Sequence, residues 1–202
     1  MANQQTQFGF KHLGGTPGWS PSYEMTPYPI RSGYSTVINF GDPVIFSSDG
    51  TLTLATPNLA TTGSIVGIFQ GCAYVPSTGP AVPTQSPYWP GAAATTAVGY
   101  VIDSPQAKFL VAAYNTAVGT TLLGNYINFT YGGLTAGTTG GAFSVATVDQ
   151  ATATTAVGTT TQTLPFRVLG MYPGVGNGSD PTTAYNWVVV GFGNQYLRSL
   201  GN

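Results

Sequence analysis

Charged side chains are scarce in this chain of 202 residues, because Asp, Glu, Lys and Arg make up only 5% of it. The usual share in a soluble protein is about 25%. Surface charge normally keeps a free monomer soluble, so Thr, Ser, Asn, Gln and Gly must cover much of this surface. Neutral surfaces do not repel copies of themselves, which favours dense packing against partners. The alternative is a Thr- and Gly-rich soluble sandwich with no special partner.

The few charges show no excess of either sign. Five bases and six acids give a net charge of −1, so the sequence lacks the basic stripe typical of nucleic-acid binding. Nucleic acid is therefore not an expected partner. The charged residues are Lys11, Glu24, Arg31, Asp42, Asp49, Asp103, Lys108, Asp149, Arg167, Asp180 and Arg198.

Three further absences exclude other classes of protein. Cys72 is the only cysteine, so no internal disulfide can form, and we expect a small buried apolar residue there. No apolar run approaches the roughly 18–20 residues of a membrane helix, so no membrane contact is expected. The first twelve residues contain no charged region followed by an apolar one, so no secretion signal is predicted.

Residues suited to catalysis are equally rare. His12 is the only histidine, and its sequence surroundings do not predict the acid and nucleophile of a triad. Most aspartates stand beside turn residues, where a carboxylate binds backbone N–H groups. A calcium site built on Asp103 or Asp180 is the alternative. We predict no enzyme activity, no catalytic residue, no metal and no cofactor.

Residues 1–35 combine prolines with large aromatic side chains. The prolines exclude a regular helix and keep the preceding residues extended, whereas a flexible linker would lack the aromatics. We predict an extended N-terminal arm that lies on a surface, which is either a neighbour's or that of its own domain.

Residues 36–202 carry strand and turn signals, and no segment has sustained helical periodicity. Asp49-Gly50 between two apolar runs predicts a hairpin, because Gly adopts the positive φ of the turn. Glycines within 65–75 predict a bend or bulge in a long strand. The expected fold class is all-β, with a single β-barrel or β-sandwich domain behind the arm. Strands are expected at 36–40, 44–46, 51–54, 65–75, 99–102, 108–113, 167–172 and 187–192, with a proline-rich loop at 76–96.

Two segments of this domain are unusual in composition. Residues 132–163 are a Thr/Gly-rich insertion, which we interpret as edge strands and long turns facing solvent or a neighbouring copy. Tyr88 and Trp89 lie in the proline-rich loop. Such an aromatic pair can anchor an oligomer interface, stack on a sugar, or fill the end of its own barrel.

Segments 41–44, 65–75, 86–90 and 100–105, which read GDPV, IVGIFQGCAYV, SPYWP and YVIDSP, occur in order within about residues 36–112. The best point in the second half is 167–170, RVLG. This pattern resembles the capsid decoration (cement) proteins of tailed bacteriophages, especially those of podoviruses of cyanobacteria and other aquatic hosts. The resemblance implies a β-rich virion protein that binds the outer surface of an assembled capsid and stabilises contacts between capsomers.

The resemblance also implies partners, location and a contact surface. The partners would be the major capsid protein and further copies of the chain, as a homotrimer made in the host cytoplasm and released with the virion by lysis. The arm would reach over a neighbouring subunit, and a closed trimer would multiply the affinity of each copy. The expected capsid-binding residues are Trp19, Tyr23, Tyr28, Ile30, Arg31 and Tyr34, with Tyr88 and Trp89 as anchors of an oligomer interface or of their own loop.

Two other functions stay open on the sequence alone. One is a carbohydrate-binding or adhesive β module with Tyr88 and Trp89 as the stacking platform. The other is a different virion part, such as a head fibre or tail component.

Overall fold

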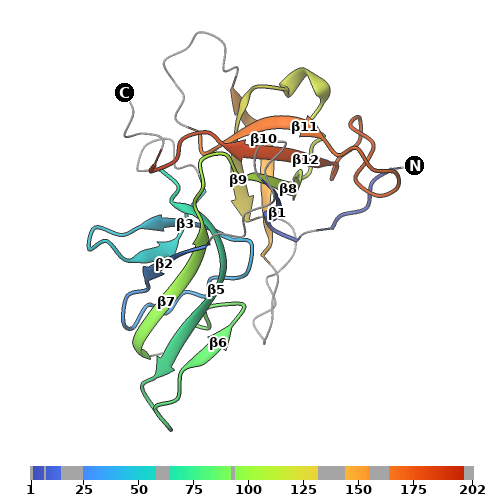
Figure 1. Cartoon of the computed structure of the whole chain (residues 1–202). Coiled ribbons are helices and arrows are strands. Elements are labelled where there is room, and N and C mark those ends of the chain that lie inside the picture. The colour runs from blue at the N-terminus through green and yellow to red at the C-terminus, as the bar shows by residue number, and fades with distance from the viewer. Residues whose placement is uncertain are drawn as a thin grey trace.

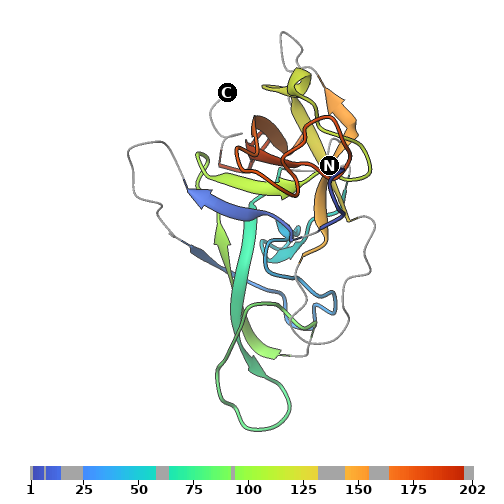
Figure 2. The same ribbon diagram turned by 90° about the vertical axis from the view of Figure 1, so that its right-hand side faces the viewer.

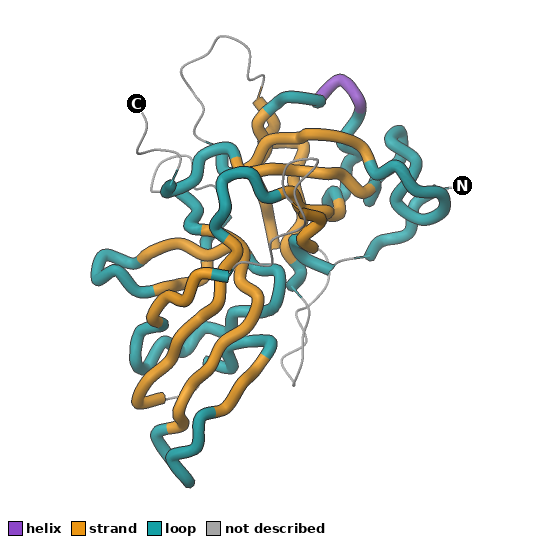
Figure 3. The backbone as a smooth tube through the Cα atoms, viewed as in Figure 1, coloured by secondary structure: helices purple, strands orange, loops and turns teal. Residues whose placement is uncertain are grey.

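The computed structural model describes residues 2–6, 8–14, 25–57, 64–91, 94–131, 144–154 and 164–197. In these residues almost all regular structure is strand, and the one helical element is the short 3₁₀ helix η2, Thr120–Leu122 (Figure 3). Two six-stranded antiparallel sheets pack together, consistent with a β-sandwich (Figures 1 and 2). The predicted all-β fold class is confirmed.

Sheet A joins the start of the chain to its second half, in the strand order β1-β8-β12-β11-β9-β10. Sheet B is built between them, in the order β2-β7-β5-β3-β4, with β6 paired to β5. The strands are β1 Lys11–Gly14, β2 Thr26–Pro29, β3 Pro43–Phe46, β4 Leu52–Leu54, β5 Gly67–Pro76, β6 Thr84–Ser86, β7 Ala94–Ile102, β8 Lys108–Ala112, β9 Tyr126–Tyr131, β10 Ala146–Thr154, β11 Phe166–Met171 and β12 Trp187–Phe192.

Each sheet curls until its ends approach one another. A bridge between Ala113 and Val148 links the end of β8 to β10 in sheet A, and a bridge between Ile30 and Leu52 links the end of β2 to β4 in sheet B. The buried side chains form two clusters, one chiefly on sheet A, which Ile68 of β5 and Ile102 of β7 also join, and one on sheet B. Phe109, Phe129, Phe166 and Phe192 dominate the first core, whereas Phe69 and Trp89 are the largest buried side chains of the second.

Two local predictions in sheet B are confirmed. Asp49-Gly50 lies in the hairpin turn between β3 and β4, with Gly50 at φ 76° and Asp49 Oδ1 accepting a hydrogen bond of 3.1 Å from the Thr51 N–H. The long strand expected at 65–75 is β5, and its register shifts between Phe69 and Gly71, where Gly71 has φ 141°. In both places the glycine supplies a backbone angle that other residues avoid.

The described part of the predicted arm belongs to the sheets instead of extending from them. Strand β1 pairs with β8, and β2 pairs with β7. The prediction of an extended backbone was right, but these residues lie on their own domain, which was the alternative reading. Pro27 and Pro29 in β2 have no N–H group, so this strand suits the edge of a sheet and resists the addition of a further strand.

Three further segments differ from the sequence prediction. Residues 36–40 form no strand, because the chain there makes only isolated bridges, such as that between Ile38 and Trp89. Strand β9 was not predicted, although Ile127, Phe129 and Tyr131 alternate with Asn128 and Thr130 in its sequence. Within the 132–163 insertion only 144–154 is described, and it holds β10, which is an edge strand of sheet A as predicted, but its Ala146 and Val148 are buried in the sheet A core instead of facing solvent.

A turn at residues 39–42 joins the two sheets and the N-terminal segment. The Gly41 carbonyl accepts a hydrogen bond of 3.0 Å from the Phe10 N–H, and the Gly41 N–H donates one of 2.8 Å to the Phe69 carbonyl. The Phe40 carbonyl accepts another, of 3.2 Å, from the Ser144 N–H just before β10. Phe10 belongs to the sheet A core and Phe69 to the sheet B core, so this turn connects both.

The packing of the N-terminal segment against Ser144 can be tested by substitution of Gly9. Gly9 has φ 67°, and a Cβ placed on it would overlap the Ser144 side chain. Gly33 has a similar φ of 75° with open space around it. We expect Gly33→Ala to lower the free energy of unfolding by about 1 kcal/mol, because alanine disfavours the left-handed backbone angle. Gly9→Ala should lower it by about 3 kcal/mol, because the new Cβ also overlaps its neighbours. Denaturant unfolding measures both, and equal losses would contradict the packing described here.

Candidate functional site

The structure describes four of the six residues expected to bind a capsid, and only one of these four is fully exposed. Trp19 and Tyr23 lie outside the described residues. The assignment of Ile30 is wrong, because its side chain is only 4% exposed and packs in the sheet B core. Arg31 is exposed in the turn between β2 and the following loop, so of the four described residues it alone lies fully at the surface.

Tyr28 and Tyr34 are half-buried and have partners within the chain. The Tyr28 hydroxyl donates a hydrogen bond of 2.7 Å to Asp103 Oδ2. Burial, together with this hydrogen bond to Asp103, raises the pKa of Tyr28 to about 12. The Tyr34 hydroxyl accepts a hydrogen bond of 2.9 Å from the Leu54 N–H. Both tyrosines thus attach the segment after β1 to sheet B.

Trp89 anchors its own loop. Its side chain is 0% exposed, and its Nε1–H donates a hydrogen bond of 2.9 Å to the Tyr34 carbonyl. Tyr74 packs edge-on against it, with ring centroids 5.5 Å apart. A ring enclosed in this way has no free face for a sugar, so the stacking platform proposed for Tyr88 and Trp89 is not present at Trp89. Tyr88 is half-buried beside it.

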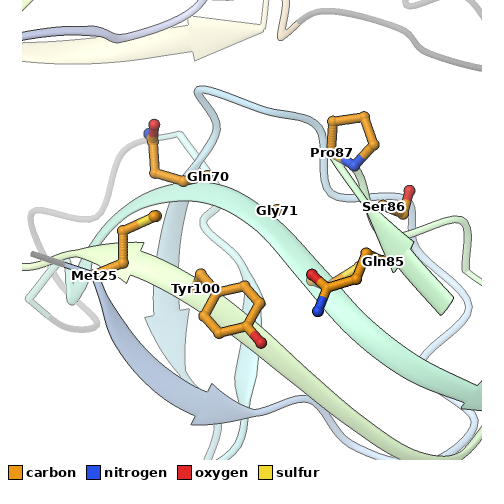
Figure 4. A pocket seen from close by; sticks show the side chains of 8 residues that line it. Met25, Gln70, Gly71, Gln85, Ser86, Pro87 and Tyr100 are labelled. Carbon is orange, nitrogen blue, oxygen red and sulfur yellow. The ribbon is translucent and has the colours of Figure 1, made fainter. Parts of the chain in front are cut away.

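The outer side of sheet B carries a groove of about 480 Å³ between β5, β6 and β7 (Figure 4). Its lining has no charged residue. Gly71 lies at the β5 bulge in this groove. A Cβ at this position would lie only 2.9 Å from the Ser86 carbonyl oxygen, so the close approach of β5 to Ser86 requires glycine. The lining residues are Met25, Gln70, Gly71, Cys72, Gln85, Ser86, Pro87 and Tyr100. Uncharged amide, hydroxyl and aromatic groups of this kind suit a neutral polar ligand.

Cys72, at the bottom of this groove, is buried as predicted. Its Sγ lies 3.3 Å from the Tyr88 carbonyl oxygen. Burial raises the pKa of the thiol to about 12, so Cys72 stays protonated and unreactive near neutral pH.

Asp42 is a buried acid in the turn that joins the sheets. It is 2% exposed, and its Oδ2 accepts a hydrogen bond of 2.7 Å from the Asn39 N–H. Burial raises the pKa of this carboxyl to about 6, against the opposing effects of the Ser144 hydroxyl and the Asn39 N–H. Other aspartates behave as the sequence predicted, since Asp49 and Asp180 accept hydrogen bonds from Thr51 and Thr182 in their own turns.

The described residues bring together no group of three or more His, Cys, Asp and Glu side chains that could hold a metal ion. His12 lies in β1 with its ring centroid 5.7 Å from that of Phe109, and burial lowers the pKa of its imidazole. Both carboxylate oxygens of Asp103, a candidate calcium ligand, accept hydrogen bonds from the Thr26 and Tyr28 hydroxyls. In the described part of the chain no helix is long and apolar enough to span a membrane.

Comparison with known proteins found no matching family model, no matching curated protein and no matching solved structure.

The Asp42 carboxyl predicts a pH dependence of stability. Its pKa is about 6 in the folded chain and about 3.8 when unfolded, so the folded state binds the proton more tightly. The contribution of Asp42 to the free energy of unfolding is therefore greatest below pH 4. It falls by roughly 3 kcal/mol in total as the pH rises through 6. The Asp42→Asn variant, which keeps an oxygen acceptor for Asn39, should lack this loss.

The measurement is the difference in free energy of unfolding between the variant and the wild type at pH 4.5 and pH 8. The difference is needed because His12, whose pKa is lowered, acts in the opposite direction over the same range. We expect the variant to gain roughly 2–3 kcal/mol relative to the wild type between the two pH values. If this difference does not change with pH, the pKa of Asp42 is not raised by burial in the folded chain.

Proposed function

We propose that this protein is a virion structural protein that binds the outer surface of an assembled capsid and stabilises contacts between capsomers. The sequence resemblance to capsid decoration proteins of tailed bacteriophages supports this, and an all-β domain is what that resemblance implies. The observation that carries the proposal is the nearly neutral surface, because many copies can then cover a capsid without repelling one another.

The structure removes one acid from a surface that already has few charges. Asp42 is buried, and Asp103 accepts two hydroxyl hydrogen bonds from β2. Asp49 and Asp180 are bound within their own turns. These four acids thus serve the fold of the chain itself, and the composition leaves neutral polar residues to cover most of the surface.

Self-association into a homotrimer is part of the proposal. A trimer on a three-fold or quasi-three-fold axis presents three copies of one weak contact to the capsid, and the effective concentration of the second and third contacts multiplies the affinity. The major capsid protein is the proposed partner, and the outer surface of the virion the proposed location.

Binding to capsids tests the proposal. Purified protein is mixed with particles assembled from the cognate major capsid protein and then sedimented. We expect saturable binding at a fixed ratio to the capsid protein, and decorated particles that resist heating better than bare ones. No binding under any salt condition, or binding only to tails or fibres, would contradict the proposal.

A carbohydrate-binding function is the second candidate, and the sheet B groove favours it instead of the Tyr88–Trp89 pair. Tyr100 offers a ring there, and Gln70 and Gln85 offer uncharged hydrogen-bonding groups (Figure 4). If this function holds, a glycan array will show binding that Tyr100→Ala reduces at least about 10-fold, the loss expected for one stacking contact. Tyr88→Ala is the matched control. An array without any bound glycan would remove this candidate.

A further inference from the structure

Three of the five bases of the chain lie on one face of sheet A, although they are far apart in the sequence. In β8 and β12, Phe109, Val111, Val188 and Val190 point into the sheet A core. Because side chains alternate along a strand, the residues between them point to the opposite, outer side. Lys108 is one of these outward residues.

The strand register places the other two bases beside it. Gly191 of β12 pairs with Lys108 of β8 on one side and with Arg167 of β11 on the other. Directly paired residues of an antiparallel sheet share a face, so Lys108 and Arg167 stand two strand spacings apart, about 10 Å. In the neighbouring row Leu110 pairs with both Val189 and Lys11, which puts the Lys11 side chain on the same face.

Apolar and aromatic groups lie between these bases. Leu169, at a register shift in β11, is 45% exposed, and a Cβ on Gly191 would be 2.9 Å from its Cδ1, so this leucine extends across the same face. The Arg167 guanidinium lies over the Tyr126 ring at 5.9 Å and donates a hydrogen bond of 2.9 Å to the Gly124 carbonyl. We call this surface the basic face, formed by Lys11, Lys108, Tyr126, Arg167, Leu169 and Val189.

In the described part of the chain, no acid is paired with a base of the basic face. None of the three forms an ion pair with a carboxylate of the described residues. Among the sheet A strands only β10 carries an acid, Asp149, which pairs opposite Asn128 at the far end of the strand order. Asp180 lies in the loop before β12 and is engaged by Thr182. Arg31, the remaining described base, contrasts with them: the pKa of Asp49 is lowered mainly by hydrogen bonds from Thr51 and also by the charge of Arg31.

We propose that the basic face is the surface that docks on the capsid, and that its partner is an acidic, partly apolar patch of the major capsid protein. This inference rests on the proposed function. Charge complementarity selects the partner, because three unpaired cations around exposed apolar groups attract a surface with carboxylates and apolar side chains. A second copy of this face would bring like charges together, so we expect the trimer contacts of the chain elsewhere.

The test compares two variants with the same net charge. One is the triple variant Lys11→Gln, Lys108→Gln, Arg167→Gln. Its control is Thr36→Glu, Ser48→Glu, Thr78→Glu, which changes exposed positions on and around sheet B by the same three charges. Co-sedimentation with capsids should show the affinity of the first variant reduced about 100-fold and that of the control within about threefold of the wild type. A circular dichroism melt verifies that both are folded.

The outcomes separate this inference from the proposed function. If the wild type does not bind capsids, the proposed function fails. If the wild type binds and the first variant binds equally well, or only the control loses binding, the basic face is not the docking surface. Wild-type binding must also weaken as salt rises from 50 to 500 mM, a readout that needs no variant. Equally tight binding of the wild type to double-stranded DNA, lost in the first variant, would overturn the choice of partner.

Discussion

The turn at residues 39–42 is the constraint on which the rest of the structure depends. Backbone hydrogen bonds from Phe10, Phe69 and Ser144 converge on it from the N-terminal segment, sheet B and the start of β10. Asp42 stabilises the turn from inside, yet burial of its carboxyl costs free energy near neutral pH. Two curled sheets, whose buried side chains form two clusters, are thus held in one arrangement. The turn thereby also fixes where the basic face of sheet A lies relative to the groove of sheet B.

The sequence correctly predicted those elements that depend on neighbouring residues, such as turns and apolar strands. Asp49-Gly50 identified a hairpin because its backbone angles are rare outside glycine, and the apolar run at 187–192 coincides with β12. The segment after the first strand was harder to predict. Its prolines and aromatics indicate an extended segment that packs on a surface. Composition does not show whether that surface belongs to the same chain or to a neighbouring subunit. Tyr34 and Ile30 turned out to serve the core of sheet B.

The candidate surfaces could not be predicted from the sequence, since they depend on pairing between distant strands. Lys11, Lys108 and Arg167 become neighbours only through the register of β1, β8, β12 and β11. The sequence correctly showed that bases are few, but it could not show that most of them share a face. Trp89 gives the opposite case, because a loop aromatic that suggested an exposed anchor is enclosed by the chain's own residues. The number of charged residues therefore does not identify a binding surface, whereas their positions in the fold do.

The central claim is that a nearly neutral β protein decorates a capsid and turns one basic face toward it. A cryo-electron reconstruction of the decorated particle, at a resolution that separates strands, tests this most directly. The account predicts three copies around each occupied axis, with β8, β12 and β11 of each copy next to the capsid and the β5–β6–β7 side of sheet B turned away. Density with sheet B against the capsid, or a particle that carries no such density on its shell, would contradict it.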